Sequence, residues 1–261
     1  MTIKKAHFKT FWSRRFLLYE LTKKGVKLKY RRSYLGIVWS LLEPILTTIV
    51  LTIVFGTLFG NRSKDYPLYI LCGRLLYSFF STGTKTSSKS IQANSSMIKK
   101  VYVPKYLYPL SCVLYNFIIF LISLIVLVPL AIFCEVPLTW HIFEILIPLV
   151  CLFLMTLGVG LILATVNVFF RDMEYLWEVL LMLIMYCSAI FYYPERLIKS
   201  GFAWILKFNP LYCAIQSFRN AMFGEAMNLH MVLYLGFVSV VALIVGILVF
   251  YKNQDKFILQ I

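Results

Sequence analysis

The sequence predicts an all-α integral membrane protein with six transmembrane helices. Six long apolar runs contain almost no ionisable side chains, at residues 36–59, 67–83, 106–133, 143–170, 175–192 and 231–251. Each is near or above the ~20 residues that an α-helix needs to cross ~30 Å of hydrocarbon. Strand-like alternation is absent, and a hydrophobic content of 61% with a mean hydropathy of +0.81 is far above that of soluble domains.

The runs and their connections nearly use up the 261 residues, so a single transmembrane domain, 1–261, is expected. It comprises a basic cytosolic segment 1–33, a six-span bundle 34–251 and a cytosolic tail 252–261. Because there is no room for a large domain outside the membrane, any soluble enzymatic activity that the protein depends on should come from another chain. We therefore expect that this chain is not an enzyme.

The net charge of +15 reflects membrane topology rather than nucleic-acid binding. Lys and Arg residues are concentrated in segment 1–33 and in the connection 84–105, and Lys252 and Lys256 follow the last run. The connections on the other side hold few of them, and Arg219 is placed there as an outside loop cation. Because basic residues accumulate on the cytosolic side of a membrane, both termini are expected in the cytosol.

Residues 7–24 are expected to form an amphipathic helix that lies in the membrane interface. Its aromatic stripe consists of Phe8, Trp12, Phe16 and Tyr19. Gly25 is predicted to end this helix. The helix could hold the chain to anionic lipid headgroups, and it could also flank a cytosolic partner, since the two uses are compatible.

Two cytosolic connections differ in character. The connection 84–105 is polar, and a short amphipathic element in it is expected to end at Pro104. The turn 167–178 holds the acidic residues Asp172, Glu174 and Glu178. Asp172 and Glu174 could form a metal pair, but residues two apart on a helix face different ways, so ion pairing or a helix-start role is favoured. The cysteines and histidines show no ligand spacing, so no metal site is expected.

The external stretch 193–231 has two apolar fragments, 202–208 and 211–223, separated by an Asn-Pro pair. Neither fragment is long enough to span the membrane, so we expect re-entrant or interfacial helices at the outer mouth. A gate is the natural use of such helices. Its candidate residues are Trp204, Asn209, Pro210 and Leu211.

Glu43 and Arg74 are ionisable residues inside predicted spans. At ~1.5 Å per residue, Glu43 lies ~10 Å from the cytosolic side and Arg74 lies ~10 Å from the outer side, so the two need not meet and no salt bridge is predicted. Ionisable groups in spans usually face the bundle interior or a watery cavity. Glu43, next to the kinking Pro44, is therefore a candidate to line a path, and pairing within the bundle is the alternative.

Four stretches run in the order of one known family over nearly the whole chain. They are residues 30–36 with Trp39 and Pro44, residues 94–104, residues 167–172, and Asn209-Pro210 followed by Phe218-Arg219. Together they resemble the membrane-spanning permease subunits of type 2 ABC exporters for polysaccharide, such as O-antigen and capsule, or for teichoic acid. The chain departs from the family pattern at Gly73, which is followed by Arg74 where a Pro-Trp pair is common.

The resemblance implies a homodimer in the bacterial cytoplasmic membrane that encloses a path for a lipid-linked glycan. Two copies of a cytosolic ABC ATPase would drive it and would bind ATP and Mg, because this chain has no G-x-x-x-x-G-K-[ST] loop and no cofactor of its own is expected. The helix before Pro104 would dock on the ATPase, supported by the turn after the fourth run. The residues implied in this coupling are Met97, Ile98, Lys99, Lys100, Val101, Tyr102, Arg171 and Asp172.

A path for carbohydrate should present aromatic faces, which pack on sugar C–H groups, beside hydrogen-bonding groups. The candidates are Tyr34, Trp39, Glu43, Tyr186, Phe191, Tyr192 and Tyr193. For each aromatic residue taken alone, a place in the interfacial belt or in ordinary packing is the alternative.

Two other functional classes stay open: a membrane-embedded glycosyl- or phosphotransferase that acts on lipid-linked sugars, and a secondary transporter. A transferase would need acids or metal ligands at one membrane face, whereas the external carboxylates are dispersed over different segments. They are Asp65, Glu135, Glu195 and Glu225. A secondary transporter would ordinarily show an internal repeat and more charge at the midplane, and neither is clear in this chain.

Overall fold

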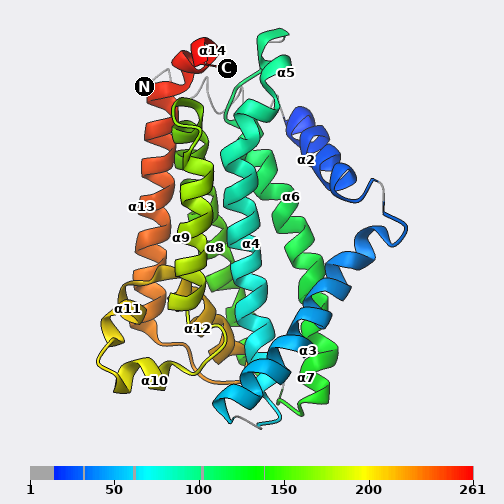
Figure 1. Ribbon diagram of the computed structural model, residues 1–261, viewed down its shortest axis with the longest axis vertical. Helices are drawn as coiled ribbons and strands as arrows, with labels where there is room; N and C mark the ends of the chain where they lie inside the picture. Colours follow the sequence, from blue (N-terminus) through cyan, green and yellow to red (C-terminus); the bar gives the residue numbers. More distant parts are fainter. Residues whose placement is uncertain (1–14, 32, 61–62, 101–102, 138, 261) are drawn as a thin grey trace.

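The computed structural model describes residues 15–31, 33–60, 63–100, 103–137 and 139–260. In these ranges the chain folds as a bundle of helices (Figure 1). Val101 and Tyr102 of the predicted coupling element lie outside the described residues, as does the part of the predicted interfacial helix that precedes Arg15.

The helices in the regions of the six predicted spans are α3 (Trp39–Phe59), α4 (Tyr66–Ala93), α6 (Leu107–Ser123), α8 (Leu146–Phe169), α9 (Met173–Cys187) and α13 (Leu229–Asn253). The other helices are α2 (Arg15–Tyr30), α5 (Ser95–Lys100), α7 (Leu127–Phe133), α10 (Pro194–Lys199), α11 (Ala203–Phe208), α12 (Pro210–Met222) and α14 (Phe257–Gln260). Single 3-10 turns, η1 (Gly36–Val38), η2 (Leu124–Val126), η3 (Trp140–Ile145) and η4 (Gln254–Lys256), continue into neighbouring helices.

Four helical segments of the described chain are long and apolar enough to cross a membrane. They are Gly36–Phe59, Leu107–Phe133, Trp140–Phe169 and Leu229–Lys256, and each corresponds to a predicted span. The other two predicted spans fold as α4 and α9, with different bounds: α4 continues well past residue 83, and α9 ends at Cys187 rather than at 192. The all-helical, membrane-embedded fold is therefore confirmed, while six as the number of crossings stays a prediction.

Helix α4 lies in the middle of the bundle, where it packs against α3, α6, α8, α9 and α12 (Figure 1). The prediction that a polar connection starts at residue 84 is wrong, because α4 continues helically to Ala93. Two threonines in this part bond to their own helix: the Thr84 and Thr86 hydroxyls each donate to the carbonyl four residues earlier at 2.8 Å. Neighbouring helices then bury Thr84, Ser87 and Ser88.

The prediction that Gly25 ends the interfacial helix is also wrong, since α2 continues through it to Tyr30. Helix α2 packs on α6, and a Cβ at position 25 would come within 2.4 Å of the Tyr115 ring. Glycine therefore serves here as a place of close approach between two helices.

Two ion pairs connect α4 to α9. The Lys85 ammonium lies 3.0 Å from the Glu178 carboxylate, and Lys89 pairs with Glu174. Ion pairing of the acidic turn, favoured from the sequence over a metal pair, is thus confirmed for Glu174 and Glu178. All four side chains are partly exposed, so each pair contributes only about 0–1 kcal/mol.

Candidate functional site

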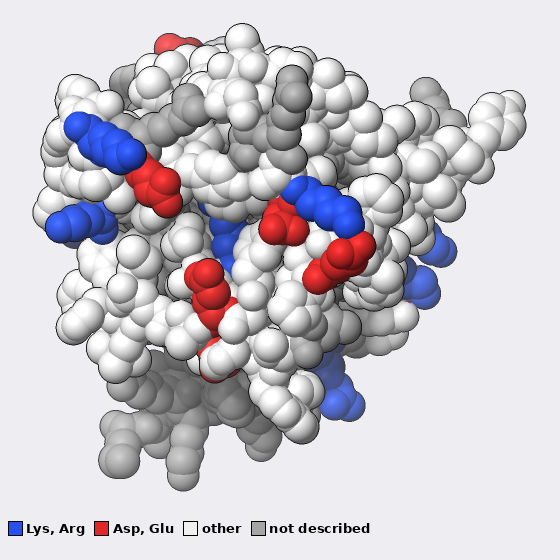
Figure 2. Space-filling view, turned by 90° about the horizontal axis from the view of Figure 1, so that it is seen from below, with Lys and Arg blue, Asp and Glu red and all other residues white. Residues whose placement is uncertain are grey.

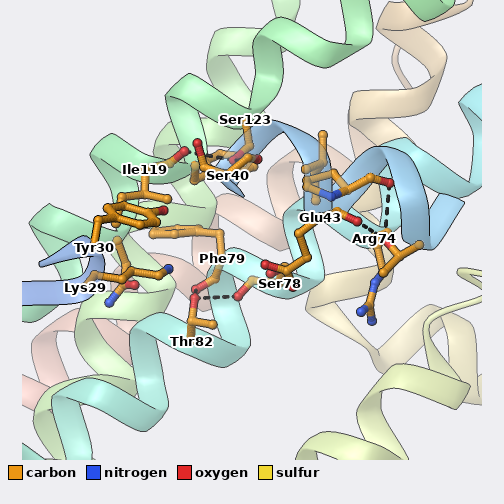
Figure 3. Close-up of a pocket in the computed structure, with 15 residues that line it drawn as sticks. Lys29, Tyr30, Ser40, Glu43, Arg74, Ser78, Phe79, Thr82, Ile119 and Ser123 are labelled. Atoms are coloured by element: carbon orange, nitrogen blue, oxygen red, sulfur yellow. Dashed lines mark hydrogen bonds between the residues drawn. The ribbon is translucent and has the colours of Figure 1, made fainter. Parts of the chain in front are cut away.

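A polar cavity of about 90 Å³ lies where α2, α3, α4 and α6 meet (Figure 3). Its polar lining consists of Lys29, Ser40, Glu43, Thr47, Arg74, Ser78, Thr82, Asn116 and Ser123. Ionisable residues inside a membrane bundle usually line a cavity or a path. Glu43, a candidate from the sequence to line a path, lies at this cavity, and Arg74 is also among its lining residues.

Pro44 removes one backbone hydrogen bond from helix α3 beside this cavity. Proline has no N–H, so the Ser40 carbonyl, four residues earlier, lacks its helical donor. The Ser123 hydroxyl of α6 donates to that carbonyl at 2.9 Å instead. Thr47, one turn further along, donates to the Glu43 carbonyl at 2.7 Å. The bond from Ser123 thus ties α3 to α6 beside the cavity.

The Lys29 ammonium and the Glu43 carboxylate face each other across the cavity (Figure 3). Burial lowers the pKa of Lys29 from its ordinary value, and the negative charge of Glu43 partly offsets this effect. None of the ion pairs recorded for the described residues includes Lys29, Glu43 or Arg74. The Arg74 guanidinium points away from the other two charged groups (Figure 3).

A larger, mostly apolar groove of about 420 Å³ lies between α3 and the end of α9. Arg74 and Thr47 line both the polar cavity and this groove. The groove also contains Tyr186 and Phe191, two of the residues predicted for a carbohydrate path. The structure thus brings Glu43, Tyr186 and Phe191 around one residue, Arg74, to which the sequence assigned no role.

The remaining path candidates lie elsewhere. Tyr34, in the α2–α3 connection, is fully exposed, and Trp39, at the start of α3, is 44% exposed. The Tyr192 hydroxyl donates to the Tyr186 carbonyl at 2.6 Å, and the Tyr193 ring lies 4.7 Å from that of Tyr69. Tyr192 and Tyr193 therefore pack beside the groove without lining it.

The predicted break at Asn209-Pro210 joins the end of α9 to the start of α12. The Asn209 carboxamide oxygen accepts from the backbone N–H groups of Leu211 and Tyr212, which caps α12. Its amide group donates to the Cys187 carbonyl at 3.2 Å and to the Ser188 hydroxyl at 2.9 Å. Helix α12 is buried in the bundle, with Leu211 only 2% exposed, while Trp204 on α11 is 59% exposed.

Arg219 on α12 is not the loop cation that the sequence suggested, because it is only 1% exposed. Its guanidinium donates to the backbone carbonyls of Tyr69, Ala189 and Ile190 at 3.0–3.2 Å and lies over the Tyr69 ring. A Cβ at position 73 would come within 2.7 Å of this guanidinium, so Gly73 makes room for it. In the sequence, the signal that could have pointed to a specific role for this arginine was the Phe218-Arg219 pair, one of the stretches that resemble the family.

The residues predicted to couple to an ATPase gather at one end of the bundle, where α5, the α8–α9 turn and α14 lie (Figure 1). Lys99 and Lys100 of α5 are exposed, as are Arg171 and Asp172 in the turn. Ile98 instead is buried in a cluster with Ile91, Tyr108 and Leu161, and Met97 packs against the same cluster. These two apolar side chains therefore hold α5 on its own bundle.

At the opposite end, which carries α10, basic and acidic side chains lie next to each other among mostly uncharged residues (Figure 2). One of the acids there, Glu135, forms an exposed ion pair with Lys64 at 2.6 Å. The described residues contain no group of three His, Cys, Asp or Glu side chains that could hold a metal ion.

Comparison with known proteins gives consistent matches over most of the chain. The family model described as ABC-2 type transporter matches residues 17–223. The chain is 30% identical over 244 residues to an O-antigen export system permease protein RfbA of Klebsiella pneumoniae, covering 92% of this chain and 93% of the relative. It is 28% identical to RfbA of Myxococcus xanthus, over 93% of this chain and 94% of the relative. It is 24% identical to the polysialic acid transport protein KpsM of Escherichia coli, over 88% and 90% respectively.

Proposed function

The chain belongs to the ABC-2 type transporter family, and from this premise we propose that it is the transmembrane subunit of an ATP-driven exporter of polysaccharide. The observation that carries the proposal is the similarity, along about nine-tenths of the chain, to permeases named for O-antigen export and polysialic acid transport. We propose a lipid-linked glycan as the substrate, with O-antigen, capsule or teichoic acid as the candidate classes.

A transferase or a secondary transporter is not favoured. The names of the similar proteins describe export and transport. Of the acids that a transferase would need, Glu135 is paired with Lys64, and Asp65, Glu195 and Glu225 lie on separate segments. We therefore infer that the chain is not an enzyme and binds no cofactor itself.

The proposed assembly is a homodimer of this chain with two copies of a cytosolic ABC ATPase, which bind ATP and Mg. Its place is the bacterial cytoplasmic membrane, and the whole chain, 1–261, acts as one six-span permease domain with lipid around it. The wide exposure of apolar side chains on α3, α9 and α13 supports contact with lipid or with a second subunit.

We propose that the glycan path follows the polar cavity and the α3–α9 groove. Glu43 and Arg74 offer charge and hydrogen bonds, while Tyr186 and Phe191 offer aromatic faces for sugar C–H groups. Tyr34, Trp39, Tyr192 and Tyr193 would then act around this path, at its entrance or behind its wall.

At the other end we propose that α10, α11 and α12 form the external gate. The bonds of Asn209 to the end of α9 support the idea that the gate helices and α9 move together. In this arrangement Pro210 and the buried Leu211 fix the start of α12, and the exposed Trp204 is the residue available to meet a second subunit.

The proposed function predicts that charge reversal on α5 uncouples the permease from its ATPase. Lys99→Glu together with Lys100→Glu should weaken association with the ATPase at least about tenfold, because reversing both charges removes the electrostatic complementarity that the two lysines are proposed to provide. Both side chains are exposed, so membrane insertion should be unchanged. The measurement is copurification of the ATPase, together with export of a labelled lipid-linked glycan.

The matched control is Lys199→Glu with Lys207→Glu, which reverses two exposed cations on α10 and α11 at the opposite end of the chain. It should leave copurification and export near the wild-type level. Normal assembly and export in the Lys99 and Lys100 variant would remove α5 from the docking site. A wild-type chain that copurifies with no ATPase and moves no glycan would contradict the function.

The proposed orientation has both termini in the cytosol. Single cysteines replacing Ser63 and Ser200, which lie in exposed connections, should react with an impermeant thiol reagent added outside intact cells. A cysteine replacing the exposed Lys99 should react only after the membrane is opened. The opposite labelling pattern would invert the topology.

A further inference from the structure

Helix α9 ends before it is long enough to cross the membrane. Its 15 residues rise about 22 Å, compared with ~30 Å of hydrocarbon. The next residues, 188–193, are not helical, and Ala189 has a φ of 48°. Ala189 and Ile190 are fully buried and Phe191 is 4% exposed. Non-helical backbone at this depth is tolerated only where protein satisfies its hydrogen bonds.

Four successive carbonyls of this segment accept hydrogen bonds from side chains of α4 and α12. The Arg219 guanidinium donates to the carbonyls of Ala189 at 3.0 Å and Ile190 at 3.1 Å. The Tyr66 hydroxyl donates to the Phe191 carbonyl at 2.6 Å. The Tyr69 hydroxyl donates to the Tyr192 carbonyl at 3.0 Å and to the Ala189 carbonyl at 3.2 Å. We call residues 66, 69 and 219 the carbonyl clamp.

Arg219 also bonds to the backbone of α4. Two of its nitrogens donate to the Tyr69 carbonyl, at 3.2 and 3.0 Å, and its guanidinium carbon lies 3.4 Å from the centre of the Tyr69 ring. None of the ion pairs recorded for the described residues includes Arg219. The planar fork of five N–H donors therefore serves carbonyls on two elements at once, which a lysine ammonium cannot reproduce.

The segment held by the clamp forms a wall of the α3–α9 groove. The Phe191 ring stacks on Phe55 of α3, with ring centres 4.9 Å apart and planes within 6° of each other. Phe191 also lies in the groove beside Arg74 and Tyr186. A shift of the 188–193 backbone would therefore move the aromatic wall of the proposed path.

We propose that Arg219 is a positioning residue of the export path: by fixing residues 188–193 against α4, it keeps Phe191 stacked on α3 and so sets the outer wall of the groove. The role of the groove as a path rests on the proposed function, but the positioning of the segment does not. The guanidinium acts through the backbone that it holds and need not touch the glycan.

The test uses a cysteine at Ala189 as a reporter in the full chain, with the six native cysteines replaced. Ala189 is fully buried, so a cysteine at this position should react slowly with a maleimide. Arg219→Lys keeps the charge and loses the fork, and should speed labelling about tenfold, which is a loss of about 1.4 kcal/mol in the free energy that keeps the segment closed. It should also reduce glycan export.

Two controls separate local opening from general damage. Lys207→Met removes an exposed cation from the neighbouring α11 and should leave the labelling rate unchanged. A cysteine at the exposed Ser200 should label at the same rate with Arg219 or with lysine at position 219. If Arg219→Lys yields no folded protein, Tyr66→Phe removes only the hydroxyl that donates to the Phe191 carbonyl, and should also speed labelling of the reporter.

Unchanged labelling of the Ala189 reporter in Arg219→Lys, or in Tyr66→Phe where the first variant does not fold, would overturn the proposal. Faster labelling in a chain whose wild type exports no glycan would uphold the positioning role and contradict the proposed function. Because labelling needs neither ATPase nor substrate, the two failures are distinguishable.

Discussion

Replacing Gly158 with alanine is expected to destabilise the bundle strongly. A Cβ at this position would come within 2.4 Å of the Ala242 backbone carbonyl and 2.5 Å of the Leu243 nitrogen. Backbone cannot rotate away as a side chain can, so α8 and α13 would have to separate. We expect the free energy of unfolding to fall by about 1–3 kcal/mol or more, measured as a lower melting temperature in detergent.

Gly246 and Gly236 on α13 provide the matched comparison. A Cβ at Gly246 would come within 2.4 Å of the Gly158 carbonyl oxygen, so Gly246→Ala should be destabilising to a similar degree. A Cβ at Gly236 would meet nothing within 4 Å, so Gly236→Ala should be neutral or stabilising by about 0.4–1 kcal/mol. Equal melting temperatures for all three variants would show that close approach of α8 and α13 is not what holds this part of the bundle.

Replacing Thr47 with tryptophan is expected to block export. Thr47 lines both the polar cavity of about 90 Å³ and the larger groove, so an indole there would fill the space where the two meet. We expect export to fall by at least about tenfold, the effect of about 1.4 kcal/mol of additional barrier. Protein yield, melting temperature and copurification of the ATPase should stay near their wild-type values.

Thr57 is the matched control on the same helix. Its hydroxyl donates to the carbonyl four residues earlier at 2.8 Å, as that of Thr47 does at 2.7 Å, but its side chain is exposed away from both spaces. Thr57→Trp should therefore retain export. If Thr47→Trp exports as well as Thr57→Trp does, the cavity and groove are not the route of the glycan.

The sequence could predict the spans that face lipid, because lipid requires long apolar runs. It predicted α3, the α6–α7 segment, α8 and α13 close to their observed bounds. It was wrong about where α4 ends, because the hydroxyls of residues such as Thr84 bond to their own helix and neighbouring helices cover them. No local pattern distinguishes a polar loop from a polar helix that is buried by its neighbours.

The same limit applies to the candidate site. Glu43 was identifiable because a carboxylate in an apolar run needs a polar surrounding. The approach of Lys29 to it depends on how α2 leans on α6, which the close contact of Gly25 with Tyr115 allows. Arg74 became part of the site only because α3 and α4 pack side by side.

By itself, then, the sequence determined the all-helical membrane fold, the family and the presence of an ionisable residue in the first span. These follow from composition, from the length of apolar runs and from short motifs, all of which are local. Only the tertiary structure decided that Arg219 is buried and which groups it binds. Its partners are the backbone carbonyls of Tyr69, Ala189 and Ile190, which lie far from it in the sequence. Backbone carbonyls are the same in every residue, so their pairing is fixed by how helices pack and cannot be read from side-chain identity.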